Sequence, residues 1–144
     1  MVVLAHTPRG SARLLRPGAL DFQRIFSAVG GYRLTPKWEF SGRLSYLSGR
    51  PYTPFNERLS NDQRRGIFDL AQVNGERLPD YFRLDVRLDR TFTVRDKPLL
   101  VFIGLQNVTN RKNVGGLTWN RRTNAVETND QLGVFPLIGM DWRF

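Results

Sequence analysis

The stretch that most constrains the fold is Tyr81–Phe92, YFRLDVRLDRTF, in which apolar and charged residues alternate. Successive side chains of a strand point to opposite faces, so a period of two indicates a β-strand and excludes an amphipathic helix. One face of this strand is apolar. The other carries charges of alternating sign, at Arg83, Asp85, Arg87 and Asp89.

The same alternation predicts two strands upstream, at Arg24–Leu34 and Trp38–Leu47. Between them, Thr35-Pro36-Lys37 is typical of a tight turn, because proline fixes φ and lacks a donor. The polar stretch from Ser48 to about Pro79 is expected to be a long loop without regular structure.

Downstream, a short turn at Val94–Pro98 leads into a predicted strand over Leu99–Trp119, with an irregularity at Asn107–Asn113. We expect a hairpin loop at Asn120–Asn129 and a last strand at Asp130–Phe144. That last strand has an apolar face and ends on an aromatic residue, whereas soluble domains usually fray at their ends. The pattern favours a strand of an outer-membrane barrel. The alternative is the amphipathic edge strand of a soluble sandwich.

Composition removes several classes of chemistry. The 144 residues include no cysteine and one histidine, His6, so disulfides, thiolate sites and histidine-based metal or catalytic sites are not expected. No apolar run is long enough for a membrane helix, and Met1–Ala5 is too short for a signal peptide. The formal net charge of +9 is spread along the chain without a nucleic-acid motif.

The sequence therefore predicts an all-β fold: an antiparallel up-and-down meander of about five strands, forming an open fragment of a transmembrane β-barrel. Single-chain barrels begin at about eight strands, so closure is not expected. The edges should be Arg24–Leu34 and Asp130–Phe144, with the chain end on the side of the short turns. Residues 1–21 are predicted to be an irregular segment, with Met1–Leu20 poorly ordered, and residues 22–144 to be the strands.

Four segments carry a resemblance to the C-terminal part of a TonB-dependent outer-membrane receptor: GGYRLTPKWEFSGRLSYLSGRPYTPF, RLPDYFRLDVRLDRTF, LLVFIGLQNVTNRKNV and the terminal GMDWRF. The resemblance implies a large barrel around a plug, in the bacterial cell outer membrane. It implies uptake of scarce nutrients, such as ferric siderophores, without catalysis. We expect no enzyme activity and no cofactor.

The resemblance also implies partners. These are outer-membrane lipid and lipopolysaccharide, the remainder of the barrel and its plug, and the barrel-assembly machinery. TonB would be reached only through a plug that lies outside this sequence, and no nucleic acid is expected. Gly139, Trp142 and Phe144 match the C-terminal signal that the assembly machinery recognises. They are equally compatible with a purely lipid-facing role, and both can hold.

Two further groups of residues are candidate sites. The first is a ladder of charges expected to line the barrel lumen and to pair between neighbouring strands: Glu39, Arg43, Arg83, Asp85, Arg87 and Asp89. Its carboxylates are expected to be ion-paired rather than catalytic. The second is a set of loop residues suited to an anionic ligand such as a ferric chelate: Arg50, Tyr52, Arg58, Arg64 and Arg65. The alternative for these is a solvated loop beside lipopolysaccharide phosphate.

The competing interpretation of the whole chain is a small soluble β-sandwich that binds anionic partners, nucleic acid included. A soluble sheet must cover its apolar face with a second layer. Five strands whose apolar residues lie mostly on one side do not supply that layer. A need for detergent during extraction would favour the barrel, and a soluble monomer would favour the sandwich.

Overall fold

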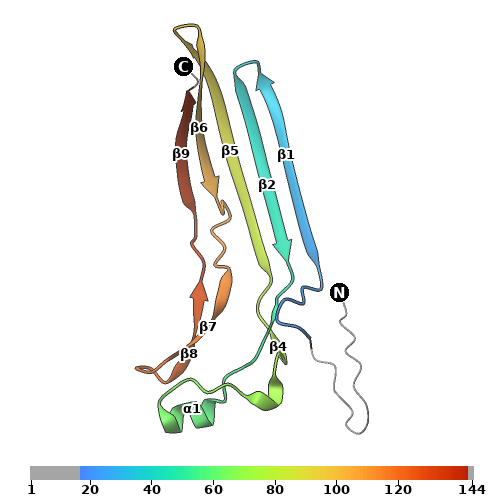
Figure 1. The fold of residues 1–144 in the computed structure, drawn as a ribbon, viewed down its shortest axis with the longest axis vertical. Coiled ribbons are helices and arrows are strands. Elements are labelled where there is room, and N and C mark those ends of the chain that lie inside the picture. Colours follow the sequence, from blue (N-terminus) through green and yellow to red (C-terminus); the bar gives the residue numbers. More distant parts are fainter. Residues whose placement is uncertain (1–16, 143–144) are drawn as a thin grey trace.

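A computed structural model describes residues 17–142 of the chain. Its main element is an antiparallel sheet in the order β1-β2-β5-β6-β9, which forms an open meander (Figure 1). The strands are β1 (Ile25–Thr35), β2 (Trp38–Leu47), β5 (Tyr81–Val94), β6 (Lys97–Gln106) and β9 (Phe135–Trp142). The predicted meander is confirmed, with β1 and β9 at its two edges and no closure between them.

Two short turns join neighbouring strands at one end of the sheet. In the β1–β2 turn, the Thr35 hydroxyl accepts hydrogen bonds from the backbone N–H groups of Lys37 and Trp38, at 3.3 and 3.1 Å. In the β5–β6 turn, Arg95 and Asp96 both have positive φ, at 50° and 57°. Positive φ at both central residues matches the twist of paired strands, which keeps a two-residue hairpin in register.

The predicted strand at Leu99–Trp119 is divided by the structure into β6 and β7 (Val114–Asn120). Asn107 and Asn110, which lie between them, adopt positive φ of 51° and so interrupt the strand. The prediction of a loop over Asn120–Asn129 is wrong, because β8 (Ala125–Asp130) lies within this range and pairs with β7 as a separate hairpin. The sequence did not predict β8 because most of its residues are polar, and its pairing with β7 depends on backbone hydrogen bonds.

The long connection between β2 and β5 is also more ordered than expected. It contains β3 (Pro51–Tyr52), α1 (Glu57–Gln63), the 3-10 helix η1 (Leu70–Gln72) and β4 (Glu76–Arg77), and β3 pairs with β4. Asn56 and Asp69 cap the two helices by accepting hydrogen bonds from the N–H groups of Leu59 and Ala71. Local capping and turn chemistry thus give this polar segment a defined path.

The molecule has two unlike ends. The short turns and the end of β9 lie at one end of the long strands, whereas α1, β4 and the β7–β8 hairpin lie at the other, the loop end (Figure 1). All buried residues of the described chain lie in the connections at the loop end and none in the five-stranded sheet: Ser48, Gly49, Pro51, Ser60, Leu78, Asn107 and Asn113. Of the segment Met1–Leu20, residues 1–16 lie outside the described part of the chain.

Candidate functional site

The sheet has one apolar face, defined by a row of register partners that crosses all five strands: Tyr32, Phe40, Leu88, Ile103 and Ile138. These side chains are largely uncovered, with Tyr32 69%, Ile103 54% and Ile138 80% exposed. Contiguous exposed apolar surface of this kind marks an interaction site. The apolar face is therefore the largest candidate interaction surface of the described chain.

Aromatic residues lie at both ends of the apolar face. Phe26, Tyr46 and Phe82 are register partners in a row at the loop end. Trp38, Phe92 and Trp142 lie near the short turns. From Trp38 to Tyr46 the strand rises roughly 26 Å, at about 3.3 Å per residue. Because membrane strands tilt by about 40°, this length covers roughly 20 Å of an apolar band about 25 Å tall, and its nine residues match the roughly 9–11 residues of a tilted membrane strand.

The opposite, polar face carries the predicted charge ladder. Register places Arg43 opposite Asp85, and Glu39 opposite Asp89. The closest ion pairs run along β5 rather than between strands: Arg83 Nε lies 2.6 Å from Asp85 Oδ1, and Arg87 Nε lies 3.0 Å from Asp89 Oδ1.

Glu39 and Asp89 are like charges placed directly opposite each other, an arrangement that is destabilising by itself. Each has its own arginine. Asp89 contacts Arg87, and Glu39 lies 3.7 Å from Arg33 on β1. The ladder thus includes Arg33, which the sequence prediction did not name.

An aromatic ring joins the ladder to the edge strand β9. Phe102 on β6 is the register partner of Gly139. A Cβ built on Gly139 would lie 2.4 Å from Phe102 Cζ, so the ring occupies the space above the glycine. The Arg87 guanidinium lies 3.8 Å from the centroid of the same ring. Gly139, predicted as part of an assembly signal, therefore has a packing role in this sheet.

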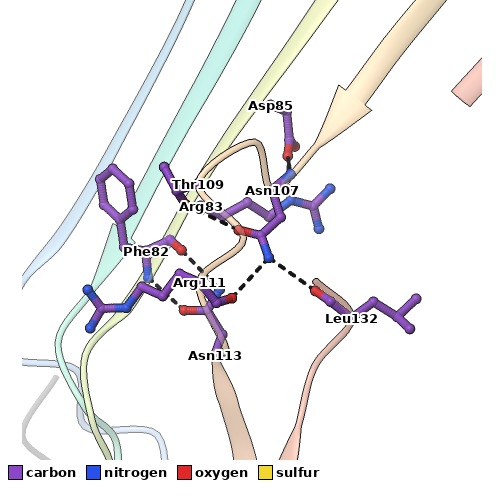
Figure 2. Close-up of polar contacts among 8 residues, drawn as sticks. All are labelled: Phe82, Arg83, Asp85, Asn107, Thr109, Arg111, Asn113 and Leu132. Atoms are coloured by element: carbon purple, nitrogen blue, oxygen red, sulfur yellow. Dashed lines mark hydrogen bonds and ion pairs between the residues drawn. The ribbon is translucent and has the colours of Figure 1, made fainter. Parts of the chain in front are cut away.

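Two buried asparagines hold the strands together where β6 ends (Figure 2). The Asn113 amide accepts a hydrogen bond from Phe82 N at 3.0 Å and donates to Phe82 O at 2.9 Å. It replaces a strand partner for β5, because the β5–β6 register extends only to Val86 and Leu105. Figure 2 shows Asn113 aligned with the Phe82 backbone in this way.

Asn107 holds three segments at once. Its backbone N–H donates to Asp85 Oδ1 at 2.8 Å, and its amide donates to the carbonyls of Arg111 and Leu132 at 2.9 and 3.1 Å. Its exposed fraction is only 3%. The positive φ of Asn107 and its amide together explain why asparagine is suited to this position in the segment LQNVTNRKN.

The predicted ligand residues do not form one cluster of shared contacts. Arg50 donates to the carbonyl of Gly115 at 2.7 Å and so ties the long connection to the β7–β8 hairpin. Arg58 lies in α1, Arg64 forms its C-cap with a φ of 50°, and Arg65 contacts Gln63. Tyr52 donates to the Glu76 carboxylate across the β3–β4 pair. Arg50, Arg64 and Tyr52 therefore have structural contacts.

Hydrogen bonds shift two pKa values at the loop end. The bond to Glu76, with burial and the negative charge of that carboxylate, raises the pKa of Tyr52 to about 12. The bond from the Tyr46 hydroxyl, with the bond from Gly49 N–H, lowers the pKa of Asp80. Asp80 is therefore an ionised acceptor that fixes the start of the long connection against β2.

An aromatic cluster joins the two long connections. The Phe55 and Phe68 rings are stacked with centroids 4.7 Å apart, and the centroids of Phe55 and Trp119 are 6.1 Å apart. The Trp119 Nε1 atom is buried and has no hydrogen-bond partner among residues 17–142. The loop end thus behaves as one packed unit.

Two of the three predicted assembly-signal residues are described. Gly139 lies within β9, and Trp142 ends it with 43% exposure, whereas Phe144 lies outside the described residues. Among residues 17–142, no group of three or more His, Cys, Asp or Glu side chains could hold a metal ion. In the same range, no helix is long and apolar enough to cross a membrane.

Comparisons with protein-family models, with curated proteins and with solved structures found no match to this chain. Sequence reasoning missed the roles of Asn107, Asn113, Phe102 and Asp80. The two asparagines lie between segments in which apolar and polar residues alternate. This position could have indicated an interruption of the strand, since asparagine favours turns.

Proposed function

We propose that this chain forms part of the wall of a bacterial outer-membrane β-barrel receptor, of the TonB-dependent class that takes up scarce nutrients such as ferric siderophores. In this role the apolar face contacts lipid and the polar face lines the lumen. The chain has a non-catalytic role, and its loop end lies on the ligand side. The rest of the barrel, a plug, the assembly machinery and, through the plug, TonB are the partners.

The observation that carries the proposal is the uncovered apolar face of the sheet. Its exposed residues share one face over five strands, while the ion pairs of Arg83, Asp85, Arg87 and Asp89 share the other. In a bilayer this separation is favourable, because lipid covers the apolar side and the charges stay in a polar interior.

The arrangement of the connections supports the same role. Short turns at one end and long connections at the other are typical of outer-membrane barrels. The soluble sandwich has less support, since within residues 17–142 no second sheet packs on the apolar face.

The test uses the absence of cysteine, which allows single labels to be placed. Ile103→Cys and the neighbouring Gly104→Cys place a polarity-sensitive fluorophore on opposite faces of β6. We expect brominated lipid in vesicles of phosphatidylcholine to quench the label at 103 much more than the label at 104. Extending the series over residues 99–106 should give quenching with a period of two.

Uniform quenching along β6, or none at any position, would contradict a lipid-facing apolar face. A clarified, monodisperse soluble monomer that does not bind vesicles would favour the β-sandwich instead. Fractionation with and without detergent, on the unlabelled chain, separates these outcomes.

A further inference from the structure

The apolar face of the sheet carries charge at only one end. Within the five strands, the described residues on this face include two charged side chains, Arg90 on β5 and Lys97 on β6. Arg90 is the register partner of Trp38 and Val101, and Lys97 is the partner of Val94, so all these residues share the face. Both charges are positive and both lie near the short turns, with no acidic residue on the same face of these strands.

The surroundings of Arg90 are those of a cation at a membrane interface. Its guanidinium carbon lies 4.8 Å from the Trp38 ring centroid and 4.5 Å from that of Phe92. Aromatic rings attract a guanidinium to their faces and leave its in-plane N–H groups directed outward. Among residues 17–142, no carboxylate lies within 4.0 Å of Arg90.

Lys97 extends the positive charge toward the rim. It follows the Arg95-Asp96 turn and is exposed. Phe92 lies between Arg90 and the Val94–Lys97 pair along β5. Phe92 therefore lies between the two cations, Arg90 and Lys97. Basic and aromatic side chains together are typical of protein surfaces at the depth of lipid headgroups.

We propose that Arg90 and Lys97 form a binding site for the phosphate of an anionic lipid headgroup, whose charge no choline balances, on the leaflet next to the short turns. This inference rests on the proposed lipid-facing role of the apolar face. Arginine suits a phosphate because its planar donors match two phosphate oxygens. An exposed guanidinium beside aromatic rings near the short turns can reach this phosphate without burying its charge in hydrocarbon.

The experiment compares binding of the full chain to vesicles of phosphatidylcholine alone and of phosphatidylcholine with phosphatidylglycerol, at low ionic strength. Each cation near an anionic surface contributes about fivefold in affinity. We expect the double variant Arg90→Gln/Lys97→Gln to lose roughly 25-fold of the preference for phosphatidylglycerol. Binding to phosphatidylcholine alone should fall much less, because the apolar face is unchanged.

Two controls isolate the site. Arg121→Gln removes an equal charge from the exposed turn between β7 and β8, at the loop end, and should keep the preference for phosphatidylglycerol. Arg90→Lys keeps the charge but not the planar pair of donors, and should lose part of the preference. Circular dichroism of each variant verifies that the strands form.

An unchanged lipid preference in the double variant, or an equal loss in Arg121→Gln, would overturn the headgroup site. The period-two quenching on β6 would stay intact in that case, so failure of the site is distinct from failure of the membrane role. Inorganic phosphate should weaken binding more than chloride does at matched ionic strength, because it carries the group that the guanidinium recognises. Equal weakening by the two anions would indicate only general screening of charge and would also overturn the site.

Discussion

The sheet and the loop end of this molecule are stabilised in different ways. The five strands are held by paired backbones and have no buried side chain, whereas the connections contain every buried residue of the described chain. The loop end has stacked rings, capped helices and buried asparagines with hydrogen-bond partners. The loop end thus has buried contacts of its own, whereas the apolar face of the sheet is left exposed within residues 17–142.

The largest expected effect tests whether the sheet depends on its surroundings. Val86 lies in the middle of the apolar face, opposite Gly42 and Leu105. In a bilayer, Val86→Arg should lower the free energy of unfolding by about 2–4 kcal/mol, because it places a cation in hydrocarbon. Leu137→Arg, on the polar face of β9 and at nearly the same depth in the sheet, should have much less effect. Urea titration from vesicles measures both, and equal penalties would contradict the assignment of the faces.

The next effect belongs to the loop end and should not depend on lipid. Asn113→Ala leaves the Phe82 N–H and C=O without their side-chain partner and should cost about 1–3 kcal/mol. Hydrogen exchange at the Phe82 amide, in detergent and in vesicles, should accelerate to a similar extent in both. Asn129→Ala, at an exposed asparagine of β8, is the matched control. Protection of Phe82 that survives the substitution would show that Asn113 is dispensable.

A smaller effect is expected where the ladder meets the edge strand. Gly139→Ala should displace the Phe102 ring and cost about 1 kcal/mol, since the ring is the flexible end of its side chain. Adding Phe102→Leu should recover part of this loss, so the two changes are not additive. Gly30→Ala, where nothing lies within 4 Å of an added Cβ, should be close to neutral. Full additivity in urea titrations would contradict the contact between the ring and Gly139.

The smallest effect is spectroscopic. Because Tyr52 has a pKa raised to about 12, its phenol should stay protonated through pH 10 and ionise near pH 12. Its contribution to stability should be complete below pH 10, the ordinary value, and disappear as the pH rises through about 12. The difference in ultraviolet absorbance between the chain and Tyr52→Phe follows this titration. Glu76→Gln should return the pKa toward 10, and an unshifted titration in the unmodified chain would exclude the Tyr52–Glu76 bond.

Sequence predicted the sheet well because period-two alternation acts on each strand separately. The bounds of β2, Trp38–Leu47, agree with the prediction, and those of β5 differ only at one end, where the strand continues to Val94. The candidate site was predicted less well. The charged residues of β5 form ion pairs with each other along the strand, although they also lie opposite charged residues of β2. Arg50 and Tyr52 form structural contacts that no local sequence pattern indicates.

The sequence by itself determined most of the residues that form the five-stranded sheet, which face of each strand is apolar, and where the tight turns lie, because these depend on alternation and on residues such as Pro36. Only the tertiary structure decided that β6 and β7 are separate, that β8 exists, and that Asn107 and Asn113 replace strand partners. Those features depend on backbone groups far apart in the chain. Their hydrogen bonds are satisfied only once the strands and connections are in place.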